Sequence, residues 1–317
     1  MYSRREWGKA LAGLSLTALT ASRLRGGGVD AAYKGVRIGA ITGSLGQPAP
    51  SPGQDVTDLI IQQCLAAKAG TVELVNTPFE PRVTGGGIGG QAPATVTPEY
   101  EKSRDELRQW RIHGPLDRFK EIRRKFDAAG LNLFSFVMTV GDDFTESEIE
   151  AVFKQMQALG VDRFCTNQSR VSAGPRIAPY AEKYRIMPTW HTHALVNDPN
   201  EVASPESLAR LLAMSKYFMV NLDLGHYADG GNDPTAYFTL HHDRISHVHV
   251  KDVQSIGGGP AAELGEGVLR IYDMLRMARD KHYPIVFIVE RTYLAPGFTA
   301  IEETRKQIDW MERALDL

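Results

Sequence analysis

The sequence predicts an α/β protein, a (β/α)8 TIM barrel that forms a single domain. Two patterns carry this prediction: short runs rich in β-branched and aromatic residues recur eight times, and stretches with helical spacing separate them. The chain of 317 residues is 43% hydrophobic and 23% charged, so it has enough apolar material for one large core. Barrels of this kind commonly run to about 250 residues as one unit.

The expected strands are short and evenly distributed along the chain. They cover residues 36–41, 71–75, 132–138, 162–166, 186–191, 218–223, 245–250 and 285–290. The expected helices cover residues 58–69, 116–129, 146–159, 177–184, 205–215, 234–242, 269–280 and 300–314. Eight such alternations favour a closed parallel barrel over an open sheet, because closure leaves no edge strand exposed. No G-x-G-x-x-G motif follows the first run, which argues against a dinucleotide-binding fold.

One connection, residues 76–115, is much longer than the others. It contains the glycine-rich segment 85–90 and then a charged, helix-prone stretch at 99–111. Loops of this length usually carry function or lack order, and a loop that follows a barrel strand lies on the catalytic face. We therefore expect a lid-like insertion after strand 2, mobile and with a short helix; an insertion without function is the alternative.

The first 32 residues are expected to be a signal segment and linker, and residues 33–317 the barrel. The sequence S-R-R-E-W-G-K at 3–9 precedes an uncharged run at 10–22 that is too short to span a bilayer comfortably. This pattern resembles the twin-arginine export signal, with Trp7 where Phe is more usual. It predicts an exported, periplasmic protein that contacts a membrane only through an uncleaved signal. An ordinary amphipathic helix is the alternative, and the cleavage site stays undefined.

Charge and cysteine content limit the partners. A net charge of -2 argues against a sequence-independent hold on nucleic acid, which needs many cations at the phosphates. Cys64 and Cys165 fall in an expected helix and an expected strand, so buried free thiols are favoured over a disulfide. The oligomeric state stays open.

Metal-binding residue types gather where four consecutive strands end. The runs finish in T-W-H-T-H (189–193), N-L-D-L-G-H (221–226), H-V-H-V-K-D (247–252) and V-E-R (289–291). The carboxyl ends of barrel strands converge on one face, so these side chains are expected to meet there. Imidazoles mixed with carboxylates suit Mn²⁺, Co²⁺, Zn²⁺ or Fe²⁺ better than Ca²⁺. The sequence therefore predicts one divalent metal ion at the barrel mouth.

These residues resemble a known family. D-L-G-H at 223–226, H-V-H-V-K-D at 247–252, G-E-G at 265–267 and the strand-end Glu290 look like the xylose isomerase-like TIM barrels, the superfamily of sugar phosphate isomerases/epimerases and endonuclease IV. The resemblance implies that His191, Asp223, His249 and Glu290 are the metal ligands. His191 is a departure, because it stands where many epimerases have a glutamate and so removes one half of the usual acid/base pair.

The resemblance implies a metal-dependent isomerase or epimerase that transfers a proton next to the carbonyl of a sugar. Glu290 is the first candidate for the base. Five further residues are expected to face the pocket and help: His193, His226, Lys251, Asp252 and Glu73. Glu73 is equally well explained by a buried ion pair, with Lys251 as a partner, and His247 is expected to point outward. Four aromatic side chains are candidates to stack on the sugar or simply to pack: Trp190, Trp110, Tyr227 and Phe79.

Export favours an unphosphorylated keto sugar as the substrate. A lyase or hydrolase of 3-keto-glycosides, using the same enolisation, is a close alternative within the same fold. A nuclease of the endonuclease IV type would need further ligands and a basic face, which the charge does not support. A non-catalytic sugar-binding barrel is the remaining alternative, prompted by the missing glutamate at the fifth strand.

Overall fold

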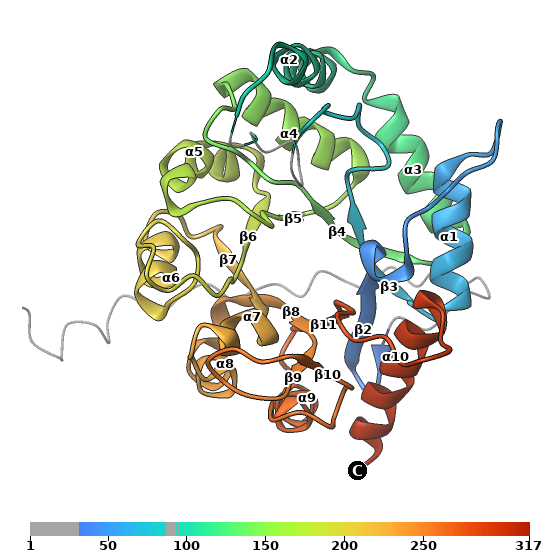
Figure 1. Ribbon diagram of the computed structural model, residues 1–317, viewed down its shortest axis with the longest axis vertical. Coiled ribbons are helices and arrows are strands. Elements are labelled where there is room, and N and C mark those ends of the chain that lie inside the picture. Colours follow the sequence, from blue (N-terminus) through green and yellow to red (C-terminus); the bar gives the residue numbers. More distant parts are fainter. Residues whose placement is uncertain (1–31, 87–92, 94) are drawn as a thin grey trace, which may run out of the picture.

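The computed structural model describes residues 32–86, 93 and 95–317, and these form a closed barrel of eight parallel strands surrounded by helices (Figure 1). Around the barrel the strands follow the order β2-β3-β4-β5-β6-β7-β8-β11, and β11 pairs with β2 to close the ring. The strands are β1 Ala32–Tyr33, β2 Val36–Ile41, β3 Thr71–Val75, β4 Asn132–Val137, β5 Arg163–Cys165, β6 Met187–His191, β7 Met219–Asp223, β8 Ile245–Val250, β9 Asp252–Val253, β10 Ala261–Ala262 and β11 Val286–Val289. The (β/α)8 prediction is confirmed.

The helices form the outer ring, visible around the strands in Figure 1. They are α1 Val56–Ala66, α2 Pro98–His113, α3 Asp117–Ala128, α4 Glu146–Leu159, α5 Gly174–Tyr184, α6 Pro205–Leu212, α7 Leu224–Asp229, α8 Pro234–His241, α9 Ile271–Asp280 and α10 Ala300–Asp316, with 3-10 turns at η1 Thr42–Leu45, η3 Val171–Ala173 and η4 His242–Arg244. Most expected helices lie within three residues of these bounds. The sequence pattern does not predict the short helix α7, which follows β7 directly.

Local sequence explains where these helices begin and end. In α4 the Thr145 side chain accepts a hydrogen bond from the backbone N–H of Glu148, and Gly160 ends the helix at φ 69°, a conformation that glycine adopts without strain. Helix α10 begins with a capping box in which Thr299 and Glu302 bind each other's backbone. The apolar faces of both helices pack on the strands, so the main core lies between the strands and the helix ring.

One glycine is required by the close approach of two strands. A Cβ atom on Gly39 of β2 would lie 1.8 Å from the carbonyl oxygen of Thr71, at the start of β3. No side chain fits at that distance, so this glycine sets how tightly the barrel closes between its first two strands.

The long insertion after β3 does form a helix, α2, but buried ion pairs fix it to the outer ring. Arg104 contacts both carboxylate oxygens of Glu148 in α4, at 2.9 and 3.0 Å. Arg111, whose side chain is fully buried, reaches Glu148 at 2.9 Å and binds Glu80 through two hydrogen bonds of 2.8 Å. The short helix expected in the insertion is present, and these paired charges hold it against α4; the mobility of the lid stays a prediction. Most of the glycine-rich segment lies outside the described residues.

The expected signal segment also lies outside the described residues, apart from its last residue, Ala32. Within the described part of the chain, no helix is both long and apolar enough to cross a membrane.

Candidate metal centre and active site

Four donor side chains meet at the carboxyl ends of consecutive barrel strands. His191, Asp223, His249 and Glu290 each offer one ligand atom, and these atoms all lie within 4.8 Å of one another. His249 Nδ1 lies 2.6 Å from Glu290 Oε2, and His191 Nε2 lies 3.3 Å from Asp223 Oδ2. The structure therefore brings together the residues that the sequence predicts as metal ligands.

The strand register produces this convergence. Asp223, the last residue of β7, is paired with His249 in β8, so the two point into the barrel at the same height. Glu290 follows β11 directly, and its backbone N–H donates to the carbonyl of Val250, at the end of β8. Because parallel strands carry their side chains to the same end, residues nearly 100 positions apart along the chain share one site.

The aspartate and the glycine of the D-L-G-H sequence each have a structural explanation. Asp223 Oδ1 accepts a 2.7 Å hydrogen bond from the backbone N–H of His226 and so caps α7. A Cβ atom on Gly225 would lie 2.7 Å from Cγ of Lys251, so glycine there leaves room for the stem of the lysine. The turn thus aims the second oxygen, Asp223 Oδ2, at the other donors.

The donor atoms fit a bound cation. Both ring nitrogens of His191 and Asp223 Oδ2 are buried, and none of the three makes a hydrogen bond of good geometry among the described residues; Asp223 Oδ2 has ion-pair contacts with His191 Nε2 and Lys251, while His191 Nδ1 has no such contact. Buried polar atoms normally have a hydrogen-bond partner, and two imidazoles with two carboxylates suit Mn²⁺, Co²⁺, Zn²⁺ or Fe²⁺. Burial opposes ionisation of Asp223, but the Lys251 ammonium and His191 together lower the pKa of the carboxyl below its usual value. An ionised carboxylate at neutral pH is the form that binds a metal.

Lys251 stands between the two carboxylates of this group. Its ammonium lies 2.8 Å from Asp223 Oδ2 and 3.4 Å from Glu290 Oε1, and its side chain is buried. Burial alone lowers the pKa of a lysine, yet the two carboxylates raise the pKa of Lys251 above its usual value. The group is therefore a fixed positive charge among the donors at this end of the barrel.

A polar layer lies below the four donors, inside the barrel. Glu73 of β3 is fully buried, and its Oε2 lies 2.7 Å from His249 Nε2 and 3.4 Å from His247 Nε2. The ring of His249 is thus held from below by Glu73 while its Nδ1 faces the upper donors. Despite burial, Glu73 and Glu290 raise the pKa of His249 to about 10. A carboxylate on the far nitrogen of a metal-binding histidine fixes the ring's orientation and tautomer.

Three histidines form a cluster at the upper edge of the site. The ring of His191 lies 5.0 Å from that of His193 and 5.7 Å from that of His226, centroid to centroid. Burial lowers the pKa of His226 to about 4, so this imidazole is neutral under ordinary conditions. His193 Nδ1 lies 2.6 Å from Glu201 Oε1. The rings of His193 and His226 therefore both lie beside His191, one of the four central donors.

One predicted role near the site was wrong, and one expected buried pair has other partners. His247 does not point outward: it is fully buried in the barrel, because residues two apart on a strand share a face and His249 faces inward. Glu73 pairs with the two histidines and not with Lys251, since its place in the middle of β3 sets it deeper than the strand ends. Its carboxylate faces the underside of His249 and not the open mouth.

Other residues expected at the pocket have structural duties. Asp252 accepts hydrogen bonds from the backbone N–H groups of Val253, Gly265, Gly267 and Leu269, so it holds the G-E-G loop in place. The aromatic candidates for sugar stacking pack in the core instead: Trp190, Tyr227 and Phe79 are buried, and Trp110 packs against the core.

Two polar residues near the site are absent from the sequence prediction. Asn221, two residues before Asp223, places its amide nitrogen 3.1 Å from His249 Nε2 and 3.3 Å from Cys165 Sγ. The strand alternation that selects Asp223 also selects Asn221 and is a signal that could have found it. Glu201 lies in the loop after β6, where no periodicity exists to indicate it.

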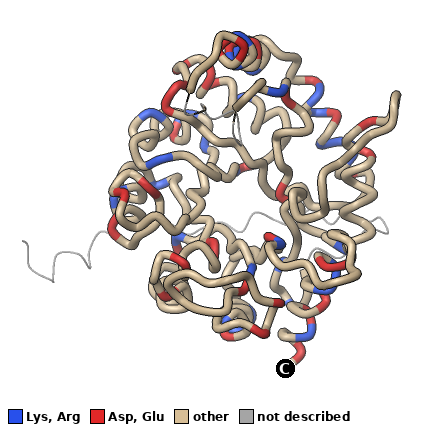
Figure 2. The backbone as a smooth tube through the Cα atoms, viewed as in Figure 1, with Lys and Arg blue, Asp and Glu red and all other residues tan. Residues whose placement is uncertain are grey.

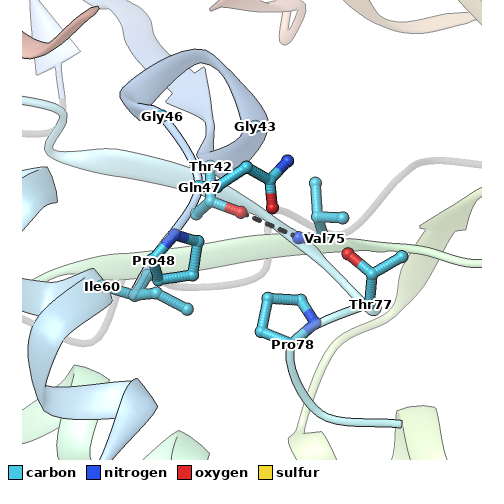
Figure 3. Close-up of a pocket in the computed structure, with 9 residues that line it drawn as sticks. All are labelled: Thr42, Gly43, Gly46, Gln47, Pro48, Ile60, Val75, Thr77 and Pro78. Atoms are coloured by element: carbon cyan, nitrogen blue, oxygen red, sulfur yellow. Dashed lines mark hydrogen bonds between the residues drawn. The ribbon is translucent and has the colours of Figure 1, made fainter. Parts of the chain in front are cut away.

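A small cleft lies apart from this group, at the rim of the barrel. Thr42, Gly43, Gly46, Gln47, Pro48, Ile60, Val75, Thr77 and Pro78 line it (Figure 3). Thr42 Oγ1 accepts a 3.0 Å hydrogen bond from the backbone N–H of Val75, which ties the end of β2 to the end of β3. None of the four central donors lines this cleft, so its residues are not part of the candidate metal centre.

Comparisons with known proteins agree with this architecture. Residues 171–314 match the family described as the xylose isomerase-like TIM barrel. No curated protein matches the chain significantly. A sugar phosphate isomerase/epimerase from Parabacteroides distasonis is 18% identical, with a TM-score of 0.57 over 90% of this chain and 96% of that one.

Two further solved structures share the fold. A probable 3-DHS dehydratase, AsbF, involved in petrobactin synthesis in Bacillus anthracis, is 15% identical, with a TM-score of 0.57 over 85% of this chain and 96% of that one. A xylose isomerase domain protein from Alicyclobacillus acidocaldarius is 11% identical, with a TM-score of 0.60 over 88% and 98%. The chain is thus a (β/α)8 barrel whose part from residue 171 to residue 314, which carries all four central donors, matches the xylose isomerase-like TIM barrel family.

Proposed function

We propose that the whole chain is a member of this family and a divalent-metal-dependent isomerase or epimerase of an unphosphorylated keto sugar. The observation that carries the proposal is the convergence of His191, Asp223, His249 and Glu290 at the barrel mouth. A sugar phosphate isomerase/epimerase of the same fold supports the reaction type.

An ion held by these four residues would supply Lewis acidity to the substrate carbonyl. The chain's own residues would do the rest. Glu290 directs Oε2 at the imidazole of His249 and Oε1 towards Lys251, so its Oε1 is the oxygen available to take the proton next to the carbonyl. The Lys251 ammonium and the neutral His226 are placed to stabilise the oxygens of the resulting ene-diolate by hydrogen bonding. His193 is the candidate for returning a proton on another side of the substrate.

Glu73 has a supporting role in this proposal. It contacts no part of the mouth but holds His249 through the ring nitrogen that faces away from the other donors. Loss of such a partner typically costs 10- to 100-fold in metal affinity or activity.

A lyase acting on 3-keto-glycosides is the second candidate. It begins with the same proton abstraction by Glu290 and then needs an acid for the leaving oxygen, a place that Lys251 or His193 can fill. A probable dehydratase has a similar fold, and this supports the lyase as the second candidate. Charge does not favour a nuclease: Lys, Arg, Asp and Glu are interspersed around the helix ring (Figure 2), and the net charge is -2.

The proposal also includes export. The S-R-R-E-W-G-K sequence at 3–9 supports a twin-arginine route to the periplasm, where phosphorylated sugars are scarce. Fusing residues 1–32 to a reporter that functions only after folded export tests this step, with Arg4→Lys/Arg5→Lys as the control that should abolish export.

Metal analysis and proton exchange test the chemistry. Purified protein should contain about one Mn, Co, Zn or Fe per chain, and Asp223→Ala or His249→Ala should empty the site. Wild-type protein should exchange solvent deuterium into one of a panel of D-ketohexoses and methyl 3-ketoglucoside, and Glu290→Gln should abolish the exchange. Release of the methanol aglycone from the glycoside would select the lyase. Full metal content in either alanine variant would refute the ligand assignment.

A further inference from the structure

Glu201 pairs with His193 at the mouth, and the proposed chemistry gives Glu201 no role. His193 Nδ1 lies 2.6 Å from Glu201 Oε1, and the glutamate side chain is only 7% exposed. The pairing with His193, more than any other contact, lowers the pKa of Glu201. A close, buried carboxylate of this kind accepts a charge-assisted hydrogen bond and does not act as a surface ion pair.

The rest of the loop fixes Glu201 in turn. Arg170 reaches Glu201 Oε2 at 3.4 Å and also pairs with Asp198. The backbone N–H of His193 donates to the carbonyl of Val202, the residue after Glu201. The loop after β6 is thus folded back on the strand end from which His193 projects, and both ends of the pair are held.

The pairing decides which nitrogen of His193 is left for a substrate. A carboxylate accepts only, so Nδ1 carries a proton, and in the neutral form of the ring Nε2 carries the lone pair. Nε2 makes no hydrogen bond within the described residues. The ring lies beside His191 and His226, with centroid distances of 5.0 and 6.0 Å. The lone pair is therefore offered next to the proposed metal ligands.

We propose that Glu201 is a positioning residue that locks His193 in the Nδ1–H tautomer, making His193 the second proton-transfer group of the active site. This rests on the proposed function, in which Glu290 is the other proton-transfer group. Glu290 takes the substrate proton in one direction of the reaction, and His193 takes it through Nε2 in the other. In that second direction the electron pair stays on the substrate, and Glu201 balances the imidazolium charge. The proton is returned to the product.

The variant Glu201→Gln should reverse the tautomer of His193. A simple loss of packing would not have that effect. Arg170 can only donate hydrogen bonds, so the amide oxygen of the glutamine turns to it and the amide NH₂ faces His193 Nδ1. The lone pair then moves to Nδ1 and the proton to Nε2. The imidazole keeps its place but presents a donor where a proton acceptor is needed.

Nitrogen NMR of the histidine-labelled full-length protein reads the tautomer directly. The wild type should show His193 as the Nδ1–H form, and Glu201→Gln should show the Nε2–H form. Arg170→Met, which removes the neighbouring cation but leaves the carboxylate, should keep the wild-type form. His193→Ala assigns the signals. An unchanged His193 tautomer in Glu201→Gln would overturn the positioning role.

Deuterium exchange into the panel sugars tests the consequence for catalysis. Glu201→Gln should lower kcat about 100-fold, the lower end of the effect of a general acid or base, with unchanged metal content. The double variant with His193→Ala should be no slower than His193→Ala alone, because both act through one ring. Additive losses would overturn the proposal. Absence of exchange by the wild type with every sugar would refute the proposed function and the proton-transfer role together, while the NMR experiment would still decide the positioning role.

Discussion

Replacing Lys251 with methionine should destabilise the metal-free protein strongly. The ammonium lies 2.8 Å from Asp223 and 3.4 Å from Glu290, and its side chain is 4% exposed. Removing one partner of a buried pair costs about 3–5 kcal/mol, because the other charge is left without compensation. Here the buried Asp223 and the partly exposed Glu290 lose the same cation, so we expect about 4 kcal/mol. For a domain of this size that corresponds to a fall in Tm of roughly 8–16 °C.

The assay is urea unfolding with EDTA and again with excess Mn²⁺. Lys183→Met is the matched control, because Lys183 pairs with Glu150 on the surface with its side chain 60% exposed, where such pairs contribute little to stability. A bound cation neutralises the same carboxylates as Lys251, so Mn²⁺ should narrow the gap between wild type and Lys251→Met. A loss no larger than that of Lys183→Met in EDTA, or a gap that Mn²⁺ leaves unchanged, would refute the reasoning.

Three further predictions concern the barrel itself. Gly39→Ala should cost about 4 kcal/mol or more in urea unfolding, since its Cβ would lie 1.8 Å from a carbonyl oxygen, whereas Gly43→Ala meets nothing nearer than 3.7 Å and should be nearly neutral; equal losses would contradict the strand-contact explanation. Burial lowers the pKa of His247 to about 4, so the unfolded chain protonates first below about pH 6.5. The free energy of unfolding, measured in EDTA, should therefore fall by up to ~1.4 kcal/mol per pH unit from about pH 6.5 towards 4, and His247→Gln should flatten that slope. Cys64 and Cys165 are fully buried and burial raises the pKa of both thiols, so neither should react with an aromatic disulfide reagent until the protein is unfolded; rapid reaction of native protein would show that the barrel opens.

The fold was predictable because residues close together in the sequence determine most helices and strands. The buried strands are short apolar runs, and helix ends carry their own signals, as at Thr145 and Gly160. The six-residue helix α7 was missed because it is too short to show a period. It forms because Asp223 caps it, a contact that depends on the site geometry and not on a repeating pattern.

The central group was also predictable, for a topological reason. Once a parallel barrel is expected, every strand end lies on one face, so His191, Asp223, His249 and Glu290 meet without any knowledge of the loops. Depth within the barrel was harder to predict. Glu73 and His247 lie below that face, and only the register between strands, which the sequence does not state, determines which polar side chains pair there.

The loop residues could not be predicted at all. Glu201 reaches His193 because the chain from 194 to 200 folds back along the strand end, and nothing periodic describes that path. The predicted stacking role of the aromatic residues was not found, and here the strand pattern itself gives the reason. Trp190 is next to His191 in the sequence, but adjacent strand residues face opposite sides, and the tryptophan packs against Phe218 in the outer core.

Asp223 uses its two oxygens for different purposes. Oδ1 starts helix α7 and Oδ2 faces the other donors. A serine in its place would still cap the helix but could not hold a cation, and a glutamate would keep the charge but lose the short reach that the cap requires. Selection for a stable chain and selection for chemistry therefore act on the same carboxylate group. Laboratory evolution of this barrel towards another substrate should leave position 223 untouched while the surrounding loops change.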